Sequence, residues 1–173
     1  VTDPRYVERR MSVPVFGEIL FSQQQLLLDR TNAGAKSLPG AAARAGLPQP
    51  ATGGVPEIQV AGGGTKVLAE RFPNDTSVEA LRAVRTSLAR DLAHSRNNIL
   101  MVIGPTPSAG KSFVAANIAT LQAEIGARVL LIDADMRRGH LASLFNQNNR
   151  GGLSEVLSDR MPLRTALRHT GID

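Results

Sequence analysis

The stretch that decides the fold reads Ile99-Leu100-Met101-Val102-Ile103-Gly104-Pro105-Thr106-Pro107-Ser108-Ala109-Gly110-Lys111-Ser112, and an alanine-rich helical pattern follows it. The apolar run at its start predicts a buried strand, and the turn after this run leads into the N-terminus of the helix. Backbone N–H groups and the positive end of the helix dipole meet at such a junction, where they attract anions. The stretch therefore predicts a phosphate-binding loop and, with it, a nucleotide site.

The residue types of this loop follow the motif G-x-x-x-x-G-K-[ST] at its end. We expect Lys111 to reach the terminal phosphates and the Ser112 hydroxyl to hold Mg²⁺. At the start of the loop, Pro105 occupies the slot of the first glycine, and the glycine comes one residue earlier. The alternative is a chance Gly-Lys-Ser between a strand and a helix. The complete set of residues expected to bind the nucleotide is Gly104, Ser108, Ala109, Gly110, Lys111, Ser112 and Phe113.

Two carboxylates follow the next apolar run. Val129-Leu130-Leu131-Ile132 predicts a strand buried on both faces of a parallel sheet, and Asp133-Ala134-Asp135 comes directly after it. Ligands of open α/β sheets bind beyond the carboxyl ends of the strands, so these carboxylates are expected to face the phosphates. Together with Ser112 they are the predicted Mg²⁺ ligands, directly or through water. The alternative for Asp133 alone is an ordinary helix cap.

Three stretches together resemble the cytoplasmic domain of the bacterial tyrosine kinases, which control capsule and exopolysaccharide export. They are the turn from Gly104 to Pro107 ahead of Gly-Lys-Ser, residues 130–137 with the pattern D-x-D-x-R, and residues 79–85 with the pattern E-x-x-R-x-x-R. The resemblance covers residues 67 to about 160. It implies an α/β fold, a P-loop NTPase-like parallel sheet flanked by helices. Ser108 stands where many members of the family have glycine.

The same resemblance implies the reaction, transfer of the γ-phosphate of ATP to a tyrosine hydroxyl with Mg²⁺ as cofactor. Lys111, Asp133 and Asp135 are then the catalytic residues. Asp133 would orient or deprotonate the tyrosine and Asp135 would lie on the metal side, although these two roles are interchangeable at the level of sequence. Two rival functions stay open: an ATPase switch of the partition class, disfavoured because no Lys lies between Gly104 and Ala109, and a non-catalytic module in which nucleotide binding sets assembly.

A helix from Thr76 to about residue 93 is predicted by apolar residues at helical spacing, and Thr76 with Glu79 fits a capping box. Glu79, Arg82 and Arg85 lie along an adjoining face of this helix. Pattern alone favours a solvated stripe of charges. The resemblance instead implies a contact between subunits of a ring-like homo-oligomer, for which the planar fork of arginine is suited.

Composition divides the chain into three parts. Residues 1–30 resemble the juxtamembrane segment of a polysaccharide co-polymerase, with a short helix after Asp3 and a strand from Val13 to Ile19. Residues 31–66 are dominated by Gly, Ala and Pro and predict a flexible linker, the alternative being an irregular loop packed on the domain. Residues 67–173 are the expected partial P-loop kinase domain, apparently truncated at its C-terminal end, because a third acidic motif and a tyrosine-rich tail are not found. Such a fragment is expected to be a weak or inactive kinase by itself.

Net charge and composition limit the kinds of partner that we expect for the chain. The net charge is +5, but the arginines are scattered and aromatic content is 3%, so we expect no nucleic-acid partner. Arg5, Arg9 and Arg10 fit either the cytoplasmic face of the bacterial inner membrane or a solvated helix face. No cysteine is present, and the three histidines lack metal-ligand spacing. The expected partners are thus further copies of the chain, a membrane co-polymerase region outside it, and polysaccharide export proteins.

Overall fold

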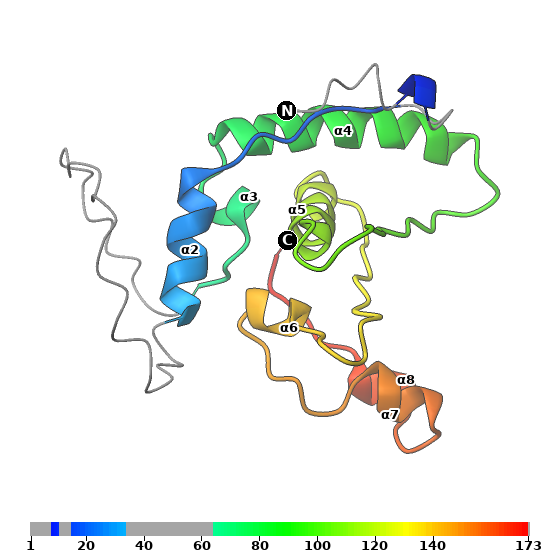
Figure 1. Cartoon of the computed structure of the whole chain (residues 1–173). Helices are drawn as coiled ribbons and strands as arrows, with labels where there is room; N and C mark the ends of the chain where they lie inside the picture. Colours follow the sequence, from blue (N-terminus) through cyan, green and yellow to red (C-terminus); the bar gives the residue numbers. More distant parts are fainter. Residues whose placement is uncertain (1–7, 11–14, 34–63, 173) are drawn as a thin grey trace.

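The computed structural model describes residues 8–10, 15–33 and 64–172 (Figure 1). Residues 8–10 form a helical turn. Helix α5 lies at the centre, in contact with α3, α4 and α6, while α2 contacts α3 and α7 contacts α8. The bounds of the helices are α2 Gln23–Ala33, α3 Leu68–Arg71, α4 Thr76–Ala93, α5 Lys111–Ala123, α6 Leu141–Leu144, α7 Leu153–Leu157 and α8 Leu163–Ala166.

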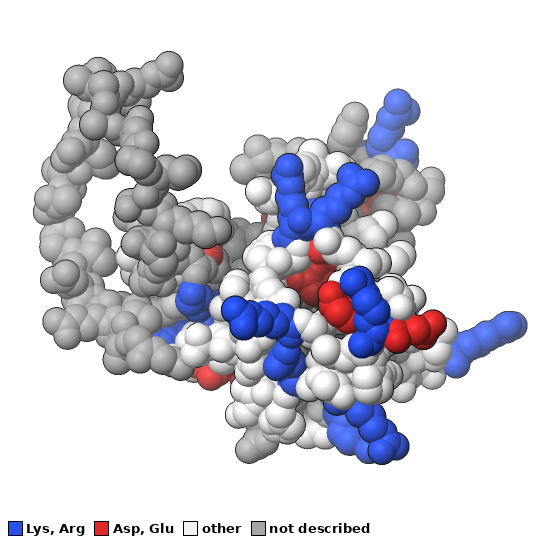
Figure 2. Space-filling model, turned by 90° about the horizontal axis from the view of Figure 1, so that it is seen from below, with Lys and Arg blue, Asp and Glu red and all other residues white. Residues whose placement is uncertain are grey.

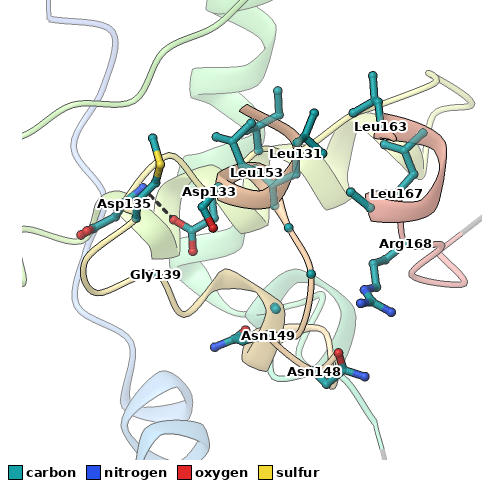
Figure 3. A pocket seen from close by; sticks show the side chains of 18 of the residues that line it. Leu131, Asp133, Asp135, Gly139, Asn148, Asn149, Leu153, Leu163, Leu167 and Arg168 are labelled. Atoms are coloured by element: carbon teal, nitrogen blue, oxygen red, sulfur yellow. Dashed lines mark hydrogen bonds between the residues drawn. The ribbon is translucent and has the colours of Figure 1, made fainter. Parts of the chain in front are cut away.

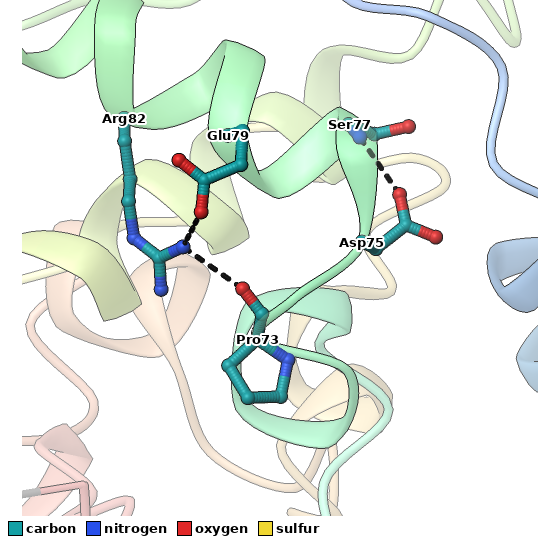
Figure 4. Close-up of polar contacts among 5 residues, drawn as sticks. All are labelled: Pro73, Asp75, Ser77, Glu79 and Arg82. Carbon is teal, nitrogen blue, oxygen red and sulfur yellow. Dashed lines mark hydrogen bonds and ion pairs between the residues drawn. The ribbon is translucent and has the colours of Figure 1, made fainter.

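The predicted helix over 76–93 is confirmed as α4, but its predicted cap is wrong. The N-cap is Asp75, whose Oδ1 accepts the Ser77 N–H at 2.7 Å (Figure 4). Glu79 does not reach back to the start of the helix, because it forms an ion pair with Arg82. Arg82 Nη1 also donates to the Pro73 carbonyl at 2.8 Å, so this pair closes over the turn that precedes α4.

The hydrophobic core joins helices from both ends of the described chain. Leucines from α2, α3, α4 and α5 are almost fully buried in one cluster, and each contributes about 1.5–3 kcal/mol of transfer free energy. Half-buried side chains such as Val84, Phe113 and Leu131 pack against its edge. The most buried members of the cluster are Leu28, Val67, Leu68, Ala69, Val78, Leu81, Ala116 and Leu121.

The segment before α2 is docked on this core. Ser22 Oγ donates to Asp75 Oδ2 at 2.7 Å and accepts the Gln25 N–H at 3.1 Å, so one buried hydroxyl caps α2 and ties it to the start of α4. Ser77 Oγ donates to the Leu20 carbonyl at 2.8 Å. Residues 15–19 form no strand, contrary to the expectation from sequence. The division into segments 1–30, 31–66 and 67–173 stays a prediction, and most of the expected linker lies outside the described residues.

The described residues contain no β-strand, so the predicted parallel sheet is not formed by them. Residues 99–104 and 129–132, expected as strands, belong to no helix or strand. The side chains of Ile99, Met101 and Ile103 are at least 75% exposed. A strand is held by the backbone bonds of a neighbour, and nothing in the described part of the chain pairs with either run. The expected sheet is unconfirmed.

Charge is spread over the surface. On the face in Figure 2, Lys and Arg side chains occupy several separate places, with acidic side chains among those near the middle. None of the described helices combines the length and the apolar composition that crossing a lipid bilayer requires.

Helix α5 is tied to its neighbours at two points. The buried Asn117 side chain accepts the Ala69 N–H at 2.7 Å and donates to the Phe113 carbonyl at 2.8 Å, which fixes α3 against the first half of α5. At the other end, Arg85 Nη1 donates to the Leu121 carbonyl at 2.8 Å. Both links come from side chains that are distant in sequence from their partners.

Arg85 completes the C-terminus of α5. The carbonyls of a last helical turn lack intrahelical partners. Those of Thr120, Gln122 and Ala123 accept the backbone N–H groups of Glu124, Ala127 and Gly126, and Leu121 takes its bond from Arg85. Gly126, two residues after the C-cap Glu124, has a φ of +84°, the left-handed conformation in which glycine often ends a helix.

We expect Arg85→Ala to lower the free energy of unfolding by about 1–2 kcal/mol, because it removes a charge-assisted hydrogen bond and leaves the carbonyl of the buried Leu121 without this donor. The control is Arg90→Ala on the same helix, where the side chain is exposed. Chemical denaturation of both variants in the full-length protein measures the difference. Equal unfolding free energies for the two variants would contradict the capping role.

Candidate nucleotide site

The phosphate loop folds back on itself at its first glycine. A Cβ at Gly104 would lie 3.1 Å from Lys111 Cγ and 3.3 Å from Ala109 Cβ, so the start of the loop packs against its end. Lys111 Nζ donates to the Thr106 carbonyl at 3.0 Å and thereby spans the loop. The close approach explains why a glycine stands at 104 although the motif places it one residue later.

Two residues of the loop have left-handed backbone conformations. Gly110, the N-cap of α5, has a φ of +83°, and Ser108 has a φ of +59°. A non-glycine residue in this region is strained by its Cβ. Ser108 therefore occupies a position where the backbone itself favours glycine.

The N-terminus of α5 provides the anion-binding groups. No side chain caps it, and the Gly110 carbonyl accepts the Val114 N–H at 2.9 Å as the first bond of the helix. The N–H groups of Lys111, Ser112 and Phe113 precede that bond and have no carbonyl partner within the helix. They point with the positive helix dipole toward the loop, which is an arrangement suited to phosphate oxygens.

The acidic residues organise the loop over 133–141. Asp133 Oδ1 accepts the Asp135 N–H at 3.1 Å, and its Oδ2 accepts the Leu141 N–H at 3.0 Å. Asp135 Oδ1 accepts the N–H groups of Arg137 at 3.2 Å and Arg138 at 2.9 Å. These four bonds give the loop one shape, with Asp133 half-buried and Asp135 exposed.

The environment of Asp135 favours its ionised form. Hydrogen bonds from the backbone of Arg138 and Arg137 lower the pKa of its carboxyl, the positive charges of Arg138 and Lys111 act in the same direction, and slight desolvation opposes them. A lowered pKa stabilises the folded state at neutral pH, and that contribution is lost only as the pH falls below about 4, the ordinary range of aspartate. Asp135 is thus a carboxylate under ordinary conditions.

A cavity of about 450 Å³ lies over the phosphate loop. It brings together most of the predicted residues, whereas Gly104 and Ala109 shape the loop without lining the cavity, and Asp133 does not line it either. The predicted residues that line it are Ser108, Gly110, Lys111, Ser112, Phe113 and Asp135.

Asp133 faces a second cavity, of about 390 Å³, on the other side of the acidic loop (Figure 3). Its walls are largely apolar and come from the 130–132 run, α7 and α8, with Leu131, Leu153, Leu163 and Leu167 among them. Asp135 is the one described residue that lines both cavities. It therefore lies between the phosphate loop and the apolar cavity.

Several residues of the first cavity were not anticipated from sequence. Gln25 and Asp29 come from α2, which was assigned to a separate juxtamembrane segment, so no local pattern pointed to them. Lys66, Arg138 and His140 add positive or titratable groups to the same walls. Arg138 directly follows the D-x-D-x-R pattern, and this position was the feature of the sequence from which its place at the cavity could have been predicted.

The donor set suits Mg²⁺ rather than a softer metal. The described residues include no cluster of three or more His, Cys, Asp or Glu that could enclose an ion. Ser112 and Asp135 instead present oxygen atoms to the cavity beside the phosphate loop. Mg²⁺ is commonly held by one or two carboxylates together with waters and substrate phosphates, and these residues fit that mode.

The loop, the helix amides without intrahelical partners and the adjacent carboxylate have the arrangement expected of a phosphate-binding site of the P-loop class. No family model matches the sequence. The chain is 42% identical over 106 residues to the tyrosine-protein kinase ptk of Acinetobacter johnsonii, a match that covers 61% of this chain and 14% of that protein. It spans only about a seventh of the length of the curated relatives that it matches.

Solved structures extend the similarity to nearly the whole chain. The BceF tyrosine kinase domain matches with a TM-score of 0.75 and 36% identity, covering 99% of this chain and 58% of that structure. The kinase domain of Escherichia coli tyrosine kinase ETK gives a TM-score of 0.72 and 34% identity, with 99% and 56% covered. Over nearly its whole length the chain is thus similar to the kinase domains of bacterial tyrosine kinases, which confirms the resemblance predicted from its motifs.

We expect Ser108→Gly to raise the free energy of unfolding by about 0.5–1 kcal/mol, because glycine adopts the left-handed conformation of this position without strain. The control is Thr106→Gly, at a loop position outside the positive-φ region, where added chain entropy should lower stability. Thermal unfolding of both variants gives the comparison. Destabilisation by Ser108→Gly as large as that by Thr106→Gly would show that the conformation is not strained.

Proposed function

We propose that this chain is the nucleotide-binding part of a protein-tyrosine autokinase that regulates capsule or exopolysaccharide polymerisation and export. The observation that carries the proposal is the cavity where Lys111, Ser112 and the α5 amides meet Asp135. The names of the relatives, tyrosine-protein kinases, support the same reaction. The substrate is ATP, and the acceptor is a tyrosine hydroxyl.

The phosphate loop binds and orients the triphosphate. The N–H groups at the start of α5 hold phosphate oxygens, and Lys111 exchanges its bond to the Thr106 carbonyl for the terminal phosphates. Phosphoryl transfer requires little covalent participation from the protein, so alignment and charge stabilisation provide most of the rate increase. The loop is already close to the needed shape because Gly104, Ala109 and Lys111 pack together.

Ser112 and Asp135 would hold Mg²⁺ on the cavity side, with Asp133 reaching its shell through water. When bound, the ion neutralises charge on the β and γ oxygens. Asp133 keeps a fixed orientation because both of its oxygens accept backbone N–H groups. At the apolar cavity, Asp133 would orient the tyrosine hydroxyl and accept its proton. Asp135 would then lie between the phosphate donor, ATP, and the acceptor hydroxyl.

We infer the cellular setting of the protein from its resemblance to the bacterial tyrosine kinases. The proposed enzyme acts at the cytoplasmic face of the bacterial inner membrane, linked to a membrane co-polymerase region outside this chain and to polysaccharide export proteins. It assembles into a ring-like homo-oligomer through Glu79, Arg82 and Arg85. The outward-facing Glu79–Arg82 pair supports the contact, whereas Arg85 is engaged within the chain by the Leu121 carbonyl.

We expect Lys111→Met to abolish phosphotyrosine on the full-length protein and to weaken MgATP binding, with a rate loss of about 10²–10³-fold, typical of removing an electrostatic group from a site of this kind. Arg96→Met, at an exposed position away from the cavity, is the control. Anti-phosphotyrosine blotting and titration calorimetry provide the two measurements.

The same experiment separates the rival functions. Unchanged phosphotyrosine in Lys111→Met would contradict the kinase. ATP turnover without phosphotyrosine in the unmodified protein would select the partition-type ATPase, and nucleotide binding without turnover would select the non-catalytic assembly module.

We expect the double substitution Glu79→Ala with Arg82→Ala to abolish self-association while leaving the fold intact, because these side chains are solvent-accessible and make only local contacts. Arg85 is left in place, since its removal also disturbs α5. Analytical ultracentrifugation of the full-length protein measures the change. An oligomer of unaltered mass would mean that the pair is an ordinary solvated stripe.

A further inference from the structure

Two adjacent arginines of the acidic loop face different cavities. Arg137, the last residue of the D-x-D-x-R pattern, lines the apolar cavity of Figure 3. Arg138 lines the cavity over the phosphate loop, together with Lys111 and Ser112. The arginine that lines the phosphate site is therefore Arg138, the neighbour of the motif arginine Arg137.

The backbone fixes this division. The N–H groups of both arginines donate to Asp135 Oδ1, which holds the two residues in one turn. Gly139 follows without room for a side chain, because a Cβ there would lie 2.7 Å from the Asp135 carbonyl oxygen and 2.9 Å from Asp133 Oδ2. The backbone of this turn is thus fixed at both ends, which keeps Arg137 at one cavity and Arg138 at the other.

The charge of Arg138 belongs to the same site as that of Lys111. Both positive groups act on the Asp135 carboxylate and line the same cavity, which Ser108 and Ser112 also line. A planar guanidinium presents paired N–H donors that match two phosphate oxygens at once, which an ammonium does not. A second cation in the cavity of the loop lysine is the arrangement expected for a group that carries several negative charges.

We propose that Arg138 binds the phosphates of the nucleotide directly, as a second cation of the cavity that Lys111 lines. The inference rests on the proposed function, because it concerns the same nucleotide site. It assigns to Arg138 the selection of nucleotides by phosphate charge, and it leaves Arg137 outside phosphate binding.

The test compares Arg138→Gln with Arg137→Gln in the full-length protein. The two substitutions remove the same charge from adjacent positions and leave the backbone bonds to Asp135 in place. Titration calorimetry uses a magnesium complex of a non-hydrolysable ATP analogue, and then magnesium ADP. We expect Arg138→Gln to weaken binding of the ATP analogue about tenfold, the loss of one charge-assisted contact, and Arg137→Gln to change it less than twofold.

Each outcome has a definite meaning. A larger loss for the ATP analogue than for ADP supports the inference and places the contact on the γ-phosphate, and an equal loss supports it with the contact on the β-phosphate. Equal effects of the two arginine substitutions would overturn it, because general charge attraction would then suffice. Lys111→Met serves as the reference: binding that is absent from the unmodified protein, or insensitive to Lys111, would instead refute the proposed nucleotide site.

Discussion

The buried amide of Asn117 is the contact on which the described fold most depends. It is 1% exposed, and its oxygen and nitrogen are satisfied by Ala69 and Phe113. An amide buried without partners costs free energy comparable to a lost hydrogen bond, so this side chain permits essentially one placement of α3 against α5. Since α2 packs on α3, and α4 is bonded to α5 through Arg85, the positions of α2 and α4 depend on this link.

The nucleotide site gains its order from that framework. Helix α5 directly follows the phosphate loop, and near its C-terminal end the Leu121 carbonyl accepts a hydrogen bond from Arg85 of α4. A site at the end of a fixed helix would need little rearrangement on ligand binding, and the proposed phosphoryl transfer would benefit from preorganisation of this kind. This order is accompanied by backbone strain at Ser108, whose φ of +59° is maintained only because the surrounding loop holds the residue in this conformation.

Local patterns predicted the parts of the fold that depend on neighbouring residues. The phosphate loop, α4, α5 and the acidic loop follow from spacing within about twenty residues. Asp75 was missed as the cap because Thr76 and Glu79 offer a competing capping box, and its second bond, from Ser22 53 residues away, is one that no local pattern shows. The docking of α2 and the role of Asn117 likewise depend on distant partners. Strands 99–104 and 129–132 were predicted from apolar content, but a strand also needs a neighbour to pair with, which a local pattern does not show.

The position of Asp135 connects the two cavities in chemical terms. Phosphoryl transfer needs a donor and an acceptor in line, with negative charge increasing between them. A carboxylate at that place would repel the reacting group unless cations offset it, and Lys111 and Arg138 lie close enough to act on its charge. The acidic loop thus supplies the positive charge that offsets its own carboxylate. The backbone N–H of Arg138 orients Asp135, and Arg138 also lines the phosphate cavity. A change that moved this turn would displace the carboxylate and the cation together, so the loop acts as one unit and not as separate residues.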